Sequence, residues 1–306
     1  MQVVALAFSR ACALPKFSRA GGAALSTVAR AKAMLSFDAG RGATITSIPL
    51  FTDNYAYCVT NASGESVVVD PADAAAVLGT VLLDESRPVR YLLAGVLTTH
   101  HHGDHAGGNV EIAAAVPGVP VIGGSAEDGK VPGASRLVQD GEVIELAGLE
   151  FSVLHTPCHT RGHVCYLLNC GDAPPCLFSG DTLFAAGCGR FFEGTAAQMH
   201  GSLCRLASLP AETRIFCGHE YTIANLHFCL FVEPDNAATV ARMEKCKRLR
   251  SEGRPTVPST IREEIETNVF LRCSHPSVVR WAAVGDDPVA VLARLREAKN
   301  AFRAPA

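Results

Sequence analysis

Short hydrophobic segments separated by polar turns dominate the chain from residue 43 onward. Residues 43–49, 55–60 and 66–69 are rich in β-branched and aromatic side chains. The polar stretches 52–54 and 61–64 between them have the Asn, Asp and Gly content of turns. This spacing predicts an antiparallel start to a sheet.

The next segments mix helical and strand patterns. Residues 72–83 carry Ala and Leu at helical spacing, and residues 91–97 form an apolar run that suits a buried strand. Further strands are expected at 120–122, 149–154, 163–168 and 176–178. Strands of this kind mixed with helices predict an α/β fold.

The last third of the chain has a helical pattern. Thr195 is a suitable N-cap for a helix whose apolar face is Met199, Leu203, Leu206 and Leu209. Residues 223–250 and 288–302 also have helical spacing with basic ends. We therefore expect a domain boundary near residue 220, with one domain at 37–220 and an α-helical domain at 221–306.

Composition excludes several classes of protein. With 306 residues and 48% hydrophobic content, the chain is neither disordered nor fibrous. A net charge of -3 disfavours a nucleic-acid partner. The apolar stretch 112–126 is shorter than the roughly 18 residues of a membrane helix and contains prolines, so no membrane partner is expected. The 12 cysteines form no C-x-x-C pair, which favours reduced thiols over a disulfide framework.

The N-terminus differs in charge from the rest of the chain. It holds five bases before the first acid, Asp38; these are Arg10, Lys16, Arg19, Arg30 and Lys32. A basic, Ala- and Ser-rich segment without acids is typical of an organellar transit peptide, which we place at 1–36. A secretory signal fits less well because its apolar part, 3–8, is short. We expect the mitochondrial matrix, with a plastid as the alternative and a cytosolic form that starts at Met34.

The histidines carry the chemical information. Four of the 11 fall within six positions, as His100, His101, His102 and His105, with Asp104 among them. They directly follow the apolar strand, where α/β folds place their chemistry. In an extended loop the side chains of His100 and His102 face the same side, where they can bind one metal ion as a pair. Asp104 and His105 can form a second pair of metal ligands. A solvated His-rich loop is the alternative, but its interleaved Asp and its place at a strand end disfavour it.

Three more candidates follow later strands. His159 lies in a turn after 151–154, Asp181 follows 176–178, and His219 follows 215–216. Together with the histidine cluster they supply enough nitrogen and oxygen ligands for two cations. His155 and His163 fit packing or supporting roles better than ligand roles. Cys158 beside His159 suggests a thiol nucleophile, but adjacent residues of an extended chain point to opposite faces.

Several motifs resemble a known family. They are THHHGDHAGGN at 99–109, TPCHT at 156–160, GDTLF at 180–184, CGRFFEGT at 188–195, CGHEYT at 217–222 and TVPST at 256–260. The histidine motif resembles the metallo-β-lactamase superfamily, and the combination resembles its hydroxyacylglutathione hydrolase (glyoxalase II) family over residues 43–303. This resemblance implies an α/β fold, a metallo-β-lactamase-like αββα sandwich with a smaller C-terminal α-helical domain.

The resemblance also implies a ligand set for two divalent metal ions. One ion would be held by His100, His102 and His159, and the other by Asp104, His105 and His219, with Asp181 and a water between them. Zinc is the expected metal, and iron or manganese are the alternatives, since imidazole and carboxylate suit all three. Asp104 would be the catalytic residue that orients the water or takes its proton.

The implied reaction is hydrolysis of S-(2-hydroxyacyl)glutathione thioesters, chiefly S-D-lactoylglutathione, to glutathione and D-lactate in methylglyoxal detoxification. A monomer is expected. The residues implied in substrate binding are Arg190, Phe191, Phe192, His219, Tyr221, Arg296 and Lys299. Two positions depart from the family: Phe192 replaces a common Tyr and so lacks one hydroxyl contact, and Gly103 replaces a bulky residue.

Three other functions fit parts of the pattern. A persulfide dioxygenase shares the fold but needs one iron and an open face for oxygen, whereas the complete second ligand set favours hydrolysis. A β-lactamase or nuclease is disfavoured because Arg190, Arg296 and Lys299 indicate a small anionic substrate. A non-catalytic metal-binding protein is the third alternative.

Overall fold

The computed structural model describes residues 34–81 and 92–305, and two β-sheets form the centre of this part. In the first sheet the strands follow chain order, antiparallel from β1 to β4 and parallel from β4 to β7. The strands are β1 (Leu35–Gly40), β2 (Ala43–Leu50), β3 (Asn54–Thr60), β4 (Ser66–Val69), β5 (Leu93–Thr98), β6 (Val121–Gly124) and β7 (Arg136–Val138).

The second sheet has the order β15-β14-β11-β10-β9-β8. Its strands are β8 (Val143–Leu146), β9 (Leu149–His155), β10 (Val164–Leu168), β11 (Cys176–Gly180), β14 (Arg214–Cys217) and β15 (Ser259–Thr260). Its only parallel pair in the described chain is β11 with β14, so these two strands end at the same edge. A small hairpin, β12 (Leu183–Phe184) and β13 (Gly187–Cys188), follows β11.

Side chains from both sheets build one core between them. Tyr57 of the first sheet packs against Phe178 and Phe216 of the second, with ring centroids 5.6 and 5.4 Å apart. Strand alternation explains the layering: Val67 and Val69 of β4 face this central core, and Val68 faces an outer core. That outer core lies under α1 (Ala74–Val81) and α3 (Asn109–Ala115), which follows the short α2 (Gly103–Ala106).

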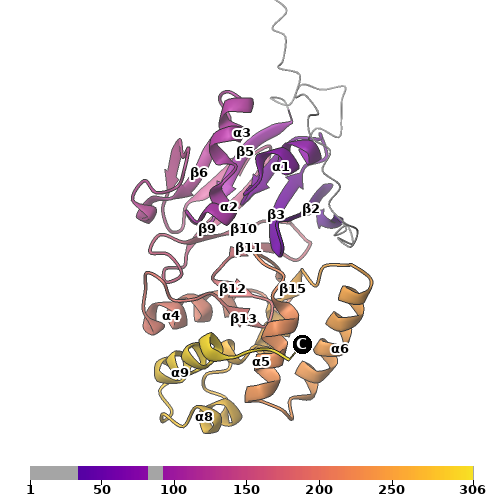
Figure 1. Ribbon diagram of the computed structural model, residues 1–306. Coiled ribbons are helices and arrows are strands. Elements are labelled where there is room, and N and C mark those ends of the chain that lie inside the picture. The colour runs from indigo at the N-terminus through magenta and orange to yellow at the C-terminus, as the bar shows by residue number, and fades with distance from the viewer. Residues whose placement is uncertain (1–33, 82–91, 306) are drawn as a thin grey trace, which may run out of the picture. The chain divides into compact units, whose positions relative to one another are not determined.

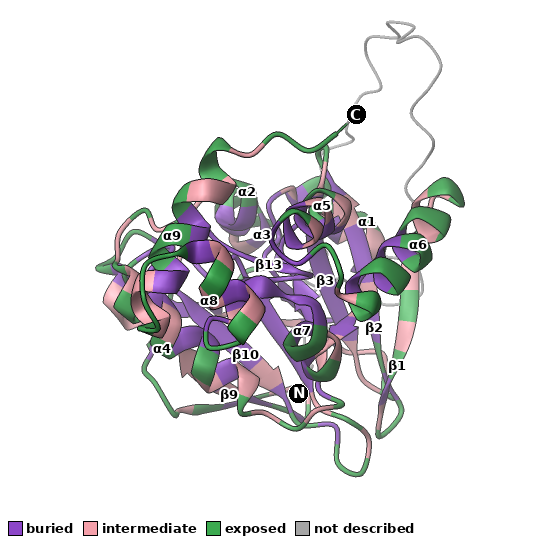
Figure 2. Cartoon of the chain, turned by 90° about the horizontal axis from the view of Figure 1, so that it is seen from below, coloured by how far each residue is buried: buried purple, intermediate pink, exposed green. Residues whose placement is uncertain are grey.

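Helices cover the outer face of the second sheet and share one apolar core with it (Figure 1). They are α4 (Ala196–Ala207), α5 (Thr222–Val232), α6 (Ala237–Ser251), α7 (Ile261–Thr267), α8 (Pro276–Ala282) and α9 (Pro288–Ala301), with one-turn 3₁₀ helices at Ser125–Glu127 and Val269–Leu271. Figure 2 shows the sheets and the inner helix faces buried and the outer faces exposed. The expected αββα sandwich with a C-terminal helical region is therefore confirmed.

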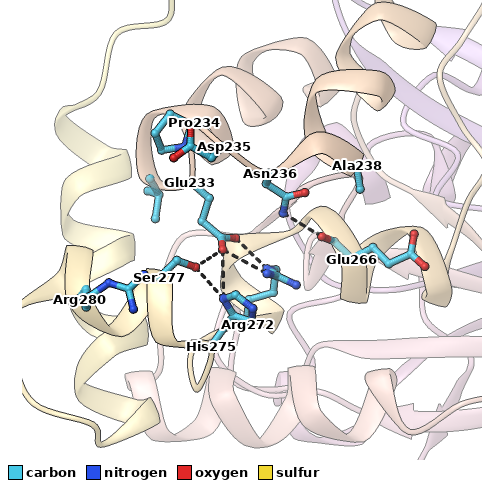
Figure 3. Close-up of a pocket in the computed structure, with 11 residues that line it drawn as sticks. Glu233, Pro234, Asp235, Asn236, Ala238, Glu266, Arg272, His275, Ser277 and Arg280 are labelled. Atoms are coloured by element: carbon cyan, nitrogen blue, oxygen red, sulfur yellow. Dashed lines mark hydrogen bonds and ion pairs between the residues drawn. The ribbon is translucent and has the colours of Figure 1, made fainter.

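A buried carboxylate joins the helical elements after α5. Glu233 is 5% exposed and accepts two bonds from Arg272, 2.7 Å from Nε and 3.1 Å from Nη2. Ser277 also donates to it, and His275 Nδ1 lies 3.3 Å away (Figure 3). These residues line a pocket of about 610 Å³. Because the charge of Glu233 is satisfied, this cluster ties α5 to the start of α8.

Most elements lie where the sequence predicts them. The strands expected at 43–49, 55–60 and 66–69 are β2, β3 and β4 to within one residue. Thr195 caps α4, with its Oγ1 accepting from the Gln198 amide at 3.3 Å. The single helical stretch predicted at 223–250 is two helices, because the chain turns at Pro234.

Strand β1 was not predicted. It begins at Leu35, so it shares two residues with the targeting segment expected at 1–36. Residues 1–33 lie outside the described chain, and the transit peptide stays a prediction. No helix in the described ranges is long and apolar enough to span a membrane.

Candidate metal centre

The predicted ligands come together where several strands end. His100 and His102 follow β5, and Asp104 and His105 lie in the α2 turn just beyond. The remaining three ligands follow the ends of strands in the second sheet: His159 after β9, Asp181 after β11 and His219 after β14. The structure therefore brings together all seven side chains that the sequence singles out.

Three imidazoles form the first group. His102 Nδ1 lies 3.0 Å from His100 Nε2 and 3.1 Å from His159 Nε2. Three ring nitrogens therefore face one small space, which is the arrangement of a three-histidine metal site. His101 turns the other way and contacts Glu127, as expected from strand alternation.

The second group is Asp104, His105 and His219. Asp104 Oδ2 is 3.4 Å from His219 Nε2 and 4.0 Å from His105 Nε2. Asn54 Nδ2 donates to the same Oδ2 at 3.1 Å and to the Asp104 carbonyl at 3.0 Å. This pair of bonds fixes the carboxylate toward the two imidazoles.

Asp181 lies between the two groups. Its Oδ1 is 3.2 Å from His105 Nε2, and its Oδ2 is 3.4 Å from His159 Nε2 and 3.6 Å from His219 Nε2. Asp181 Oδ1 and His105 Nε2 are both buried, and in the described chain they face each other at 3.2 Å without forming a hydrogen bond. Buried polar atoms are almost always paired, so a nitrogen and a carboxylate oxygen arranged in this way are suited to bind a cation between them. The donor set and these atoms fit a binuclear metal site.

Four of the imidazole rings are oriented by contacts with residues around the site. In each of these rings Nδ1 contacts such a neighbour, and Nε2 is thereby directed toward the other candidate ligands. The four contacts are His100 with Thr99 Oγ1 at 3.1 Å, His105 with Asp70 Oδ2 at 3.0 Å, His159 with the Arg190 carbonyl at 3.0 Å, and His219 with Asp53 Oδ1 at 2.8 Å.

The two groups differ in their affinity for protons. Burial lowers the pKa of His159 to about 4 and that of His100 well below its usual range. Burial would also lower the pKa of His219, but Asp104 and Asp181 raise it to about 10. The first group therefore presents neutral imidazoles, whereas the second group would have to release protons if a cation were bound there.

The centre opens into a pocket of about 480 Å³. Five of the candidate ligands line it: His102, Asp104, His159, Asp181 and His219. The same pocket is lined by the predicted glutathione contacts Arg190, Phe192, Tyr221, Arg296 and Lys299, and also by Asn300, Phe302 and Arg303. The Tyr221 ring stacks on His219 with centroids 4.6 Å apart. Phe191 does not line this pocket and packs against the core of the helical region. A side chain at Gly103 would meet open space.

The two basic residues of α9 have different surroundings. Arg296 is 7% exposed, and its Nη1 donates to the Cys188 carbonyl at 2.8 Å. Lys299 is less enclosed and donates to the Ala224 carbonyl at 2.8 Å, with Phe228 and Phe302 beside its ammonium group. Burial lowers the pKa of Lys299 to about 8. Arg296 is therefore partly structural, whereas Lys299 keeps donors free for a ligand.

Several residues that position the candidate ligands were not predicted from the sequence, or their role was not decided. Asp70 accepts bonds from the Thr99 amide and hydroxyl, both at 2.8 Å, and it directly follows β4, so the strand-end signal was available for it. Asp53 and Asn54 were interpreted only as a turn. His163 is fully buried and accepts a bond from the Asp181 amide at 3.1 Å, a supporting role as expected.

The thiol-nucleophile alternative finds no support. Cys158 is buried, and its Sγ donates to the Thr195 carbonyl at 3.3 Å. Burial raises its pKa to about 12, so it is a neutral thiol near pH 7.

Comparison with known proteins gives two family matches that adjoin along the chain. Residues 51–219 match the metallo-beta-lactamase superfamily, and residues 220–302 match the hydroxyacylglutathione hydrolase C-terminus. A "Hydroxyacylglutathione hydrolase" of Photobacterium profundum is 46% identical over 262 residues, covering 85% of this chain and 99% of that protein. A "Hydroxyacylglutathione hydrolase cytoplasmic" of Arabidopsis thaliana is 42% identical over 260 residues, covering 84% of this chain and 98% of that protein.

A solved structure gives the same picture of the fold. The crystal structure of ETHE1 from Myxococcus xanthus aligns with a TM-score of 0.56 and 24% identity. The alignment covers 89% of this chain and 93% of that one.

Proposed function

The chain belongs to the hydroxyacylglutathione hydrolase family of the metallo-β-lactamase superfamily, and we propose that it hydrolyses S-(2-hydroxyacyl)glutathione thioesters, chiefly S-D-lactoylglutathione, to glutathione and D-lactate. One observation carries the proposal: five of the seven candidate ligands line one pocket together with several basic and aromatic residues, and the other two ligands, His100 and His105, lie buried behind them. An anionic thioester fits such a pocket, with its carbonyl near the histidines.

Seven residues would hold the two cations. His100, His102 and His159 would take one, Asp104, His105 and His219 the other, and Asp181 would contact both. When bound, such ions lower the pKa of a shared water and polarise a carbonyl. We propose zinc, because borderline imidazole nitrogens supply five of the seven donors; iron and manganese suit the same set.

Asp104 is the catalytic residue of this proposal. Its side chain is 46% exposed, so it reaches the pocket, and the two bonds from Asn54 hold it in place. Bonds from His219 and the charge of His105 keep its pKa below the usual range, so it is an anion at neutral pH. It can therefore accept a hydrogen bond from the attacking water and orient it toward the thioester carbonyl.

The basic and aromatic residues of the pocket would bind the glutathione part of the substrate. Lys299 and Arg190 offer positive charges to its carboxylates, and Tyr221 offers a phenol on a ring held by His219. Phe192 supplies apolar surface close to His159, with ring centroids 5.1 Å apart. These contacts involve groups that do not react, so they contribute to binding rather than to the chemical step.

Cellular context completes the proposal. The acid-free basic N-terminus supports import into the mitochondrial matrix, with a cytosolic form starting at Met34.

A direct assay tests the function. The purified protein loaded with zinc is mixed with S-D-lactoylglutathione, and the release of free thiol and D-lactate is followed. We expect one glutathione for each D-lactate. Consumption of oxygen with glutathione persulfide, and no release of D-lactate, would instead identify a persulfide dioxygenase. Bound metal without either reaction would indicate a binding protein.

A further inference from the structure

Two cysteine side chains meet at the far end of β11 from Asp181. Cys170 follows β10 and Cys176 begins β11, with residues 171–175 as the turn between them. Their sulfur atoms are 3.6 Å apart, and no other two sulfurs in the described ranges make such a contact. Cys176 pairs with Leu168 across the hairpin, so both cysteines share one face and point into the core between the sheets.

A guanidinium group lies beside this pair. Arg214 of β14 pairs with Cys176 in the parallel ladder. Its Nη1 donates to the Asp38 carbonyl and its Nη2 to the Pro174 carbonyl, but its Nε is buried without a partner in the described chain. The hydrogen bond between Cys170 and Cys176 and the charge of Arg214 lower the pKa of Cys170 to about 7, although burial opposes this. The pKa of Cys176 is raised instead.

We infer that Cys170 and Cys176 form a redox-active dithiol that hydrogen peroxide converts reversibly into a disulfide. Cys170 is 3% exposed but adjoins an exposed turn at Gly171 and Asp172, so a local opening of this turn would let a molecule as small as peroxide reach it. A thiolate with a second thiol at contact distance is the arrangement that favours a disulfide over further oxidation.

The reaction balances in two steps. The Cys170 thiolate attacks one peroxide oxygen, the O–O bond breaks, and the hydroxide released takes up a proton to give water and a sulfenic acid. Cys176 sulfur then attacks Cys170 sulfur, the S–O bond breaks, and this hydroxide takes the Cys176 proton as a second water. Two thiols lose two electrons in total, and the peroxide gains them. A disulfide needs a sulfur separation of about 2.05 Å, so a small shift of the turn suffices.

Peptide mass spectrometry tests the inference on the full chain. The reduced protein is treated with peroxide, its free thiols are alkylated, and it is digested with trypsin. Both cysteines fall in the peptide 162–190, which has no internal Lys or Arg and also contains Cys165 and Cys188. We expect two alkylation sites to be lost at Cys170 and Cys176, with a mass decrease of two hydrogens that dithiothreitol reverses.

Variants separate the pair from other thiols. Cys176→Ala should stop at a Cys170 sulfenic acid that dimedone traps, and Cys170→Ala should give no disulfide. Cys204→Ala is the matched control, because Cys204 is the exposed cysteine of the described chain; it should form the disulfide at the wild-type rate. Arg214→Met should slow the oxidation.

The inference is wrong if Cys170 and Cys176 both stay alkylatable under conditions that oxidise Cys204. A disulfide to Cys165 or Cys188 would also overturn it. Each cysteine variant is compared with the parent by circular dichroism, and if one fails to fold, the other decides.

Discussion

Replacing Lys299 by alanine should weaken substrate binding without slowing the chemical step. The ammonium group can donate three hydrogen bonds, and the Ala224 carbonyl takes one. Lys299 lines the pocket that holds the candidate metal centre, so the other two donors are available to a ligand bound there. The proposal that Lys299 holds a glutathione carboxylate therefore predicts a selective loss in Lys299→Ala.

The expected size follows from the surroundings of the side chain. A hydrogen bond between charged groups contributes about 1.5–3 kcal/mol. Because Lys299 is only partly enclosed, we take the lower end, which corresponds to a rise in KM of about tenfold. The value of kcat should stay nearly constant, because this contact is equal in the ground state and the transition state.

Steady-state kinetics with S-D-lactoylglutathione measures both constants. Arg294→Ala is the matched control: it removes a basic residue of the same helix that contacts Trp281 and does not line the pocket. Its KM should equal that of the parent. A small thioester without glutathione carboxylates should show no effect of Lys299→Ala. If kcat of Lys299→Ala fell at constant KM, the assignment of Lys299 to binding would be refuted.

Three further predictions follow from the same site. Asp181→Ala should lose metal at both positions, whereas His159→Ala should mainly lose one, and metal analysis per chain decides this; two metals retained in Asp181→Ala would disprove the bridging role. Since the pKa of Lys299 is about 8, its charge is present below that pH and lost above it, so KM should rise as pH passes 8 in the parent but not in Lys299→Arg. N-terminal sequencing of mitochondrial and cytosolic fractions should find residues 1 to about 33 missing from the first and Met34 at the start of the second; intact residues 1–33 in both would contradict import with cleavage.

Arg296 shows why the sequence could not separate binding from structure. Spacing places Arg296 and Lys299 on one helix face, and the pattern predicts the same role for both. In the structure Arg296 is buried against the Cys188 carbonyl, a contact across 108 residues of sequence. Helical periodicity says nothing about such a distant partner.

The candidate ligands could be predicted because their signals are local. Four histidines within six positions after an apolar strand stand out by themselves, and the family motifs implied His159, Asp181 and His219, which also stand near strand ends. The residues that orient them carry weaker signals. Asp53 reaches His219 across 166 positions, and its place in a turn explains an Asp equally well without any metal.

The local sequence pattern also explains why two features of the secondary structure, the break between α5 and α6 and strand β1, were not predicted. The helical spacing of 223–250 continues across Pro234, so the break between α5 and α6 was overlooked. β1 lies next to the basic N-terminal segment, and the composition of that segment hid its short alternation of apolar and polar residues.

Turnover measured against metal content tests the central claim most directly. The protein is stripped with a chelator, reloaded stepwise with zinc, and assayed with S-D-lactoylglutathione at each step. We predict no turnover without metal and full release of glutathione and D-lactate when two ions are bound per chain. A fully loaded protein that leaves the thioester intact, or a stripped protein that still hydrolyses it, would contradict the account.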